Sequence, residues 1–174
     1  MMVHVPMCTH KDPKNVLIVS DDDQVLQQEL LRYLAIKGTT ISVQNALESI
    51  RDLDDDSYDV IMCETQGNSA FLAHLSRVAA YDALLVVAHL GLNDVDTSTQ
   101  LMQTLGHDFK IMMPYNAGEQ ILLLASKAYH PTADVILQRA DLLEGQEYYN
   151  SDIHVAAFAM PNYIRKTYRG IIRN

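Results

Sequence analysis

Carboxylate side chains closely follow two apolar runs of the chain, and they are its strongest candidates for chemistry. Asp21 and Asp22 come after the run 16–19, and Glu64 comes after the run 58–63, which begins in an acidic turn. Short apolar runs bounded by polar turn signals are typical of strands buried on both faces. In open α/β sheets, ligands collect at the carboxyl ends of such strands. Glu64 is therefore a candidate catalytic or binding carboxylate.

Alternating strand and helix patterns predict how these acids are positioned. Strand patterns cover 16–19, 40–43, 58–63, 84–88 and 109–112, and helix patterns cover 26–34, 46–53, 70–80, 93–105 and 118–129. Because parallel strands need helical crossovers, five such units predict an α/β fold with a doubly wound, five-stranded parallel sheet of the flavodoxin-like type. Its common strand order, 2-1-3-4-5, has a crevice between strands 1 and 3. That crevice would bring Asp21, Asp22 and Glu64 together.

Length and composition limit the classes of function. The 174 residues are 48% hydrophobic and 20% charged, which fits one globular core with an appendage rather than a disordered chain. A net charge of −9 makes nucleic acid an unlikely partner, because phosphate binding depends on clustered Lys and Arg. No run is long enough to span a membrane, and the beginning of the chain lacks an apolar signal segment. Cys8 and Cys63 are expected to be reduced thiols, so the predicted location is the cytoplasm.

The acidic residues admit several readings. Asp21, Asp22 and Glu64 could bind residual Mg²⁺ or Ca²⁺, since hard cations need only oxygen ligands, although no cofactor is required. Glu64 could instead be a structural carboxylate that accepts from a backbone N–H group. Asp23 is expected to be the N-cap of the first helix. No GxGxxG pattern or P-loop follows the first strand, which leaves a dinucleotide or nucleoside-triphosphate site with little support.

The first thirteen residues contain possible soft metal ligands at unfamiliar spacing. His4, Met7, Cys8 and His10 could bind copper or zinc, but Cys8 and His10 do not follow a known paired motif. The sequence favours a loosely ordered arm here.

Residues 14–129 resemble a receiver domain of bacterial two-component response regulators. The motifs that carry the resemblance are VLIVSDDD, RYLAIKG, YDVIMCE, VVAHL and GHDFKIMMPY. The resemblance implies an N-terminal arm at 1–13, a receiver-like domain at 14–130 and a mainly helical C-terminal extension at 131–174.

The positions that match the functional residues of receivers are altered here. The phosphoacceptor aspartate matches Glu64, and the Mg²⁺-binding acidic pair matches Asp21 and Asp22, or Ser20 and Asp21 in the other register. The remaining matches are Val87 or Ala88 for the hydroxyl residue, Met113 for the lysine, and Lys110, next to Phe109, for the aromatic switch. Loss of the fixed cation and of the hydroxyl removes the charge stabilisation that phosphoryl transfer needs. The resemblance thus implies a degenerate receiver, a pseudo-receiver without enzymatic activity, that signals through protein–protein interaction.

A protein partner is expected at one of two surfaces. The resemblance implies a homodimer through 93–105, 109–112 and 118–129, and the C-terminal extension is the other candidate. That extension carries Arg165, Lys166, Arg169 and Arg173 between apolar residues, so it could pack on its own domain or on a second copy. Two alternative functions stay open, a transcriptional regulator with a minimal DNA-binding tail and a metal-dependent phosphoacceptor receiver. No membrane partner is expected.

Overall fold

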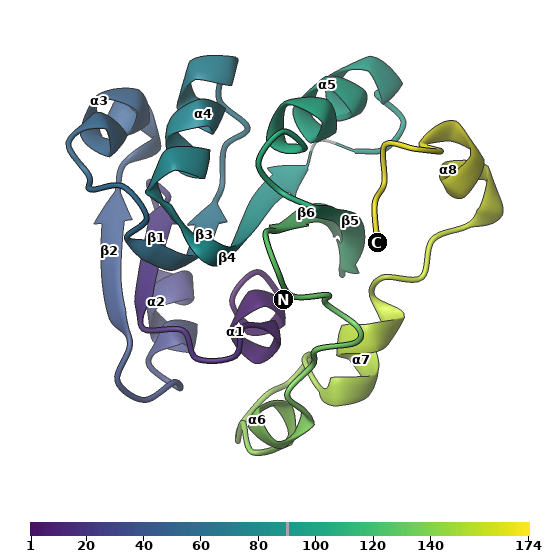
Figure 1. Cartoon of the computed structure of the whole chain (residues 1–174). Coiled ribbons are helices and arrows are strands. Elements are labelled where there is room, and N and C mark those ends of the chain that lie inside the picture. Colours follow the sequence, from purple (N-terminus) through teal and green to yellow (C-terminus); the bar gives the residue numbers. More distant parts are fainter. Residues whose placement is uncertain (90) are drawn as a thin grey trace.

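A six-stranded sheet with helices on both faces forms the body of the molecule (Figure 1). The structure is a computed structural model that describes residues 1–89 and 91–174, and the side chain of His89 also lies outside the description. The strands are β1 (Asn15–Val19), β2 (Lys37–Ile41), β3 (Tyr58–Cys63), β4 (Ala79–His89), β5 (Ile111–Ala117) and β6 (Gln120–Ser126).

The strand order differs from the predicted one. It is β2-β1-β3-β4-β6-β5, in which β1 to β4 are parallel and β6 runs antiparallel to both of its neighbours. The prediction of a five-stranded, all-parallel, flavodoxin-like sheet is therefore wrong. The half made of β1, β2 and β3 does keep the predicted 2-1-3 arrangement, so the carboxyl ends of β1 and β3 are adjacent.

The error lies in the segment 118–129, which was predicted to be a helix and contains β6. Its run of Ile121 to Ser126 is almost continuously apolar, and such a run does not distinguish a buried strand from a buried helix by periodicity. Gly118 has φ of 80° and turns the chain tightly from β5 into β6. A glycine with positive φ is typical of hairpin turns. Gly118 therefore indicated a turn between two strands, and the helix prediction did not take it into account.

Helices on one face of the sheet agree well with the predicted patterns. They are α3 (Ala46–Arg51), preceded by the 3₁₀ turn η1 (Val43–Asn45), α4 (Ser69–Val78) and α5 (Val95–Leu105). On the other face, α2 (Gln24–Leu30) is shorter than its pattern. Leu31 and Leu34, predicted to continue its apolar stripe, are 83% and 92% exposed.

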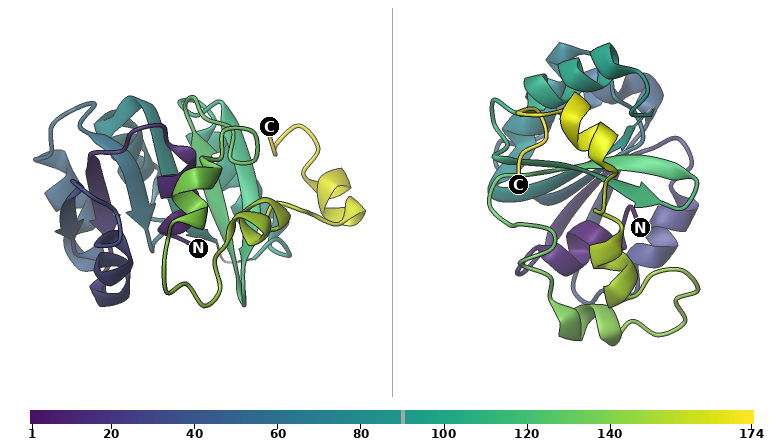
Figure 2. Two further views of the ribbon diagram at one scale, coloured as in Figure 1. Left: turned by 90° about the horizontal axis from the view of Figure 1, so that it is seen from below. Right: turned by 90° about the vertical axis from the view of Figure 1, so that its right-hand side faces the viewer.

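Helices cover both faces of the sheet (Figure 2), and an apolar core lies on each side of it. Leu17 and Val19 of β1 face the core under α3, α4 and α5, whereas Val16 and Ile18 face the core on the other side. All four side chains are fully buried, which confirms that the run 16–19 is a strand covered on both faces.

The N-terminal residues fold back under the sheet. Helix α1 (His4–Thr9) is buried along its whole length, so the prediction of a loosely ordered arm is wrong. Arg139 fixes the end of this helix, because its guanidinium donates to the backbone oxygens of His10 at 2.7 Å and Lys11 at 2.9 Å. A helix end needs such partners for its last carbonyl groups.

The C-terminal residues form α6 (Leu137–Asp141), α7 (Ser151–Ala156) and α8 (Asn162–Thr167). Helix α6 packs against α1 below the sheet, and the later residues pass the outer edge of β5 (Figures 1 and 2). Met112 N donates to Arg173 O at 2.7 Å, and Asn116 N donates to Ala157 O at 2.9 Å. Between them Pro114 has no N–H group to expose. The tail therefore packs on its own chain, one of the two arrangements predicted for it. Among the described residues, no helix is long and apolar enough to cross a membrane.

Candidate functional site

The carboxyl ends of β1, β3 and β4 meet at one edge of the sheet, as predicted. Val19 pairs with Cys63, so β1 and β3 end in register. Cys63 pairs with Val87, and β4 continues from there to His89. The residues that come next along β1 and β3 are Ser20 and Glu64. This edge is where substrates of open α/β proteins usually bind.

Glu64 is held in place from two directions. Its backbone N–H donates to Val19 O at 3.0 Å, which continues the β1–β3 ladder by one residue. The hydroxyl group of Ser20 donates to Oε2 of Glu64, and Ser20 itself is only 3% exposed. The Glu64 side chain is exposed to solvent, so one carboxylate oxygen is fixed while the carboxylate still faces outward. Such an arrangement can bind an ammonium group or accept a proton.

The aspartates after β1 point to different partners. Oδ1 of Asp21 accepts from the hydroxyl of Ser42 and from Val43 N at 2.9 Å, so Asp21 turns toward the end of β2. The N–H group of Asp22 donates to Ser20 Oγ at 3.0 Å, while its exposed carboxylate faces solvent. The three predicted ligands Asp21, Asp22 and Glu64 are thus brought to the same edge. They are not among the groups of described residues whose ligand atoms lie within 4.8 Å of one another. Mg²⁺ binding by them stays a prediction.

Asp23 occupies the N-cap position of α2, as expected, but its side chain makes no capping bond to the helix. Its Oδ2 instead accepts from Thr40 Oγ1 at 2.6 Å and Gln27 Nε2 at 3.2 Å. These two hydrogen bonds lower the pKa of the Asp23 carboxyl. Asp23 therefore joins α2 to β2 and takes no part in the exposed site.

A cleft lies between the loop after β3, the start of α4 and one side of α5, and Glu64 itself does not line it. It has a volume of about 280 Å³. Gln66 lines it and donates from Nε2 to Ala88 O at 3.2 Å, which ties the loop after β3 to β4. Asn68 caps α4 by accepting from Phe71 N at 2.9 Å. The cleft is lined by Gln66, Gly67, Asn68, Ser69, Leu72, Thr97, Gln100, Leu101 and Thr104.

The positions assigned through the receiver resemblance are distributed over the sheet. Val87 is fully buried in β4, beside the half-buried Ala88. Phe109 is buried under Lys127, whose Nζ lies 5.7 Å from the ring centroid, and Lys110 is exposed.

Met113 lies on β5, and β6 separates that strand from β4. Met113 therefore does not occupy the strand next to β4, where the expected order 2-1-3-4-5 would have placed it. The predicted dimer surface is affected in the same way. Its helix 118–129 contains a strand inside the sheet, so that surface cannot form as described, and dimerisation itself stays a prediction.

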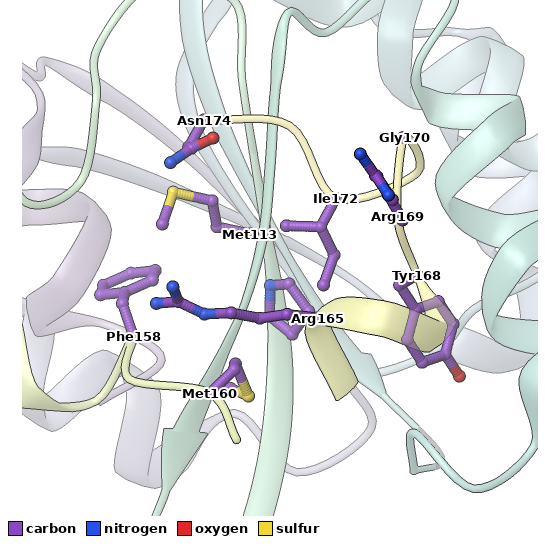
Figure 3. Close-up of a pocket in the computed structure, with 10 residues that line it drawn as sticks. Met113, Phe158, Met160, Arg165, Tyr168, Arg169, Gly170, Ile172 and Asn174 are labelled. Carbon is purple, nitrogen blue, oxygen red and sulfur yellow. The ribbon is translucent and has the colours of Figure 1, made fainter. Parts of the chain in front are cut away.

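A second cavity lies away from the strand ends, between β5 and the C-terminal residues (Figure 3). Its volume is about 250 Å³, and Met113, Phe158 and Tyr168 are part of its wall. Arg165 reaches into it from α8. None of the strand-end acids lines this cavity, so it is a separate feature of the tail.

Acidic residues at the carboxyl ends of parallel strands are typical of open α/β proteins. Comparison with known proteins makes this class more specific. A polyamine aminopropyltransferase of Helicobacter acinonychis is 28% identical over 202 residues, covering 100% of this chain and 77% of that protein. The polyamine aminopropyltransferase of Clostridium beijerinckii is 26% identical, and the match covers 98% of this chain and 77% of that protein. No protein-family model matches the chain.

Solved structures identify the fold. The spermidine synthase of Thermotoga maritima aligns with a TM-score of 0.82 at 20% identity, over 96% of this chain and 72% of that one. A spermidine synthase in complex with the transition-state analogue AdoDATO gives the same TM-score at 21% identity. The chain therefore has the fold of spermidine synthase, with a mixed six-stranded sheet.

These findings overturn the resemblance to receiver domains and what it implied. The similar proteins are named as enzymes, so the predictions of a non-enzymatic pseudo-receiver, a DNA-binding regulator and a phosphoacceptor are wrong, as are two-component signalling and transcription regulation. The motifs VLIVSDDD and YDVIMCE indicate only buried parallel strands that are followed by acidic residues. That pattern is shared by many α/β proteins, because the carboxyl ends of their strands carry the functional residues.

Proposed function

We propose that this chain is an aminopropyltransferase that binds a polyamine-type substrate at the carboxyl ends of β1 and β3. The observation that carries the proposal is the match to curated polyamine aminopropyltransferases along the whole chain, at 28% identity. The fold supports it, since a spermidine synthase with the same fold binds a transition-state analogue.

The chemistry of such a transfer fits an acidic site. Spermidine synthase uses decarboxylated S-adenosylmethionine as a substrate, and this donor is a sulfonium that also carries an amine. An uncharged amine of the acceptor attacks the carbon next to sulfur, the C–N bond forms, and the C–S electron pair stays on sulfur. The new ammonium then releases one proton. Both substrates are cations, so carboxylates are the side chains expected to bind and orient them.

Glu64 is the residue we assign to the reacting amine. One of its oxygens accepts from Ser20, and the other is available to an ammonium group or a proton. Asp22, exposed at the end of β1, is the second candidate for a substrate ammonium. The net charge of −9 adds an attraction for cationic substrates at low ionic strength. We also place the protein in the cytoplasm, since both of its cysteines are free thiols.

Product formation with Glu64→Gln tests the proposal. Purified chain is supplied with decarboxylated S-adenosylmethionine and a diamine or triamine, and the aminopropylated product is measured by mass spectrometry. Loss of the charge should lower kcat/KM by about 100-fold or more, a transition-state cost of about 3 kcal/mol. Glu119→Gln, an exposed change in the β5–β6 turn, should leave the rate unchanged. Absence of product with every amine tried, from folded protein that does not bind the donor, would refute the assignment.

A further inference from the structure

Three potential metal ligands meet at the opposite end of the sheet from Glu64. His10 follows α1, Asp59 is near the start of β3, and Asp82 is in the first half of β4. One side-chain ligand atom from each lies within 4.8 Å of the others. A metal ion with bonds of about 2 Å could contact all three after a small contraction.

The imidazole of His10 points into this cluster without a hydrogen bond at Nε2. The residue is 3% exposed, and among the described residues its Nε2 is a buried side-chain atom that lacks a hydrogen-bond partner. The nearest carboxylate oxygen, Oδ1 of Asp82, is 3.5 Å away. Buried polar atoms are normally satisfied, so an orphaned ring nitrogen beside two carboxylates calls for an explanation.

The two carboxylates are already oriented by neighbouring groups. Oδ2 of Asp59 accepts from Lys14 N at 2.7 Å and Asn15 N at 2.8 Å. Oδ2 of Asp82 accepts from the hydroxyl of Tyr129 at 2.9 Å. In each case the other oxygen is left for a ligand, and outer hydrogen bonds of this kind are what hold metal-binding carboxylates in place.

Among the residues that the structure describes, no lysine or arginine forms an ion pair with the two carboxylates of this cluster. Burial is the main cause that lowers the pKa of His10, and the carboxylates of Asp82 and Asp59 oppose this shift. Lys14 Nζ pairs with Asp12 at 2.7 Å instead. Arg139 donates to backbone oxygens of the segment 7–11.

We propose that His10, Asp59 and Asp82 form a binding site for a divalent transition-metal ion, with Zn²⁺ as the best fit. One imidazole nitrogen and two carboxylate oxygens suit Zn²⁺, which takes such ligands at about 2.0–2.2 Å and completes its shell with water. Binding at Nε2 moves the ring proton to Nδ1. A protonated Nδ1 can no longer accept the hydrogen bond that Asp12 N donates to it at 3.2 Å. The turn after His10 therefore shifts when the ion binds.

The site has a structural purpose that is separate from the proposed transfer reaction. A bound metal ion would link the end of α1 to β3 and β4, at the end of the sheet opposite Glu64. Because it depends on neither Glu64 nor a substrate, the failure of one proposal leaves the other standing.

Zinc titration of metal-free protein tests the site. The full chain is dialysed against a chelator, and Zn²⁺ binding is followed by calorimetry and by the shift in thermal unfolding temperature, with Mg²⁺ in parallel. We expect saturable binding of one Zn²⁺ per chain, a higher unfolding temperature, and a much weaker response to Mg²⁺. Asp59→Asn and Asp82→Asn keep the shape and an accepting oxygen. Each should weaken Zn²⁺ binding by more than about tenfold, since even outer-shell partners contribute 10–100-fold.

Two further variants separate this site from other zinc ligands. Glu64→Gln and His107→Gln, which alter an exposed acid and an exposed histidine elsewhere, should bind Zn²⁺ as the unmodified chain does. X-ray absorption of the zinc-bound protein should show nitrogen and oxygen neighbours and no sulfur. The proposal is overturned if Zn²⁺ does not bind saturably, if folded Asp59→Asn and Asp82→Asn proteins bind it unchanged, or if sulfur ligands appear.

Discussion

At the scale of single residues, the Ser20–Glu64 hydrogen bond is the contact on which the proposed reaction should depend most. Replacing Ser20 by Ala removes the hydroxyl that Glu64 Oε2 accepts from and frees the carboxylate to rotate. A hydrogen bond to a charged group contributes about 1.5–3 kcal/mol. We therefore expect kcat/KM for aminopropyl transfer to fall by about tenfold or more, measured by product formation at several amine concentrations.

Ser20→Thr and Ser57→Ala are the matched comparisons for this prediction. Threonine keeps the hydroxyl and should restore most of the rate. Ser57 lies before β3, at the other end of the sheet, and its hydroxyl donates to Asp54 O at 2.6 Å. An equal loss in Ser57→Ala and Ser20→Ala would show that the effect comes from general destabilisation rather than from the position of Glu64.

The sequence located one of the two candidate sites and missed the other. Glu64 was identified because an apolar run predicts where β3 ends, and the structure ends that strand at Cys63. His10, Asp59 and Asp82 belong to three segments far apart in sequence. Each has an ordinary local pattern, and His10 was considered only with its sequence neighbours as a possible metal ligand. No local pattern shows that a fold brings distant residues together.

At the scale of elements, two helices on one face of the sheet were predicted well, and the strand order was predicted correctly as far as β4 but not beyond it. The helices expected at 70–80 and 93–105 correspond to α4 and α5 within a few residues. Strand β6 was missed because its local pattern is ambiguous. That single error changed the sheet from mixed to parallel and made the receiver resemblance look consistent.

Lys127, which follows β6, is predicted to stabilise the C-terminal end of α4. Its Nζ donates to Ser76 O at 3.1 Å and Ala79 O at 2.6 Å, where a helix leaves carbonyl groups without partners. Burial lowers the pKa of Lys127, and the nearby acids Asp56 and Asp108 oppose this shift. Lys127→Met keeps most of the side-chain volume but leaves both carbonyls unsatisfied.

We expect Lys127→Met to lower the free energy of unfolding by about 1–3 kcal/mol, measured by urea denaturation at pH 7. Lys166→Met, an exposed change in α8, should alter it by less than about 0.5 kcal/mol. If the two variants have the same stability, the contact of Lys127 with the end of α4 contributes nothing.

At the scale of the whole molecule, two buried histidines join the N-terminal and C-terminal segments under the sheet. His4 Nε2 lies 3.0 Å from Glu29 Oε2, and its Nδ1 lies 2.8 Å from the hydroxyl of Tyr33. His154 Nε2 donates to Pro131 O at 2.9 Å, so its Nδ1 accepts from the hydroxyl of Tyr149 at 2.7 Å. Both rings are therefore well placed as neutral imidazoles.

These histidines should make the fold sensitive to mild acid. Burial is the largest cause that lowers the pKa of each to about 4, and the N-terminal amino charge lowers both further. In the unfolded chain the pKa of histidine is about 6.5. The unfolded state consequently binds more protons between pH 6.5 and pH 4, so the stabilisation is complete above pH 6.5 and is lost as the pH falls toward 4.

We expect the free energy of unfolding to fall by roughly 2 kcal/mol per histidine between pH 7 and pH 5, measured by urea denaturation. His4→Gln and His154→Gln can keep hydrogen bonds but do not titrate, so the double variant should lose the part of this pH dependence that the two residues contribute, even if it is less stable at pH 7. Burial also lowers the pKa of His10, which stays in the double variant and keeps its own contribution. His107→Gln, at an exposed position, should keep the dependence of the unmodified chain. Exposed carboxylates titrate mostly below pH 5, so a decline in the double variant as steep as that of the unmodified chain would show that His4 and His154 do not cause the acid sensitivity.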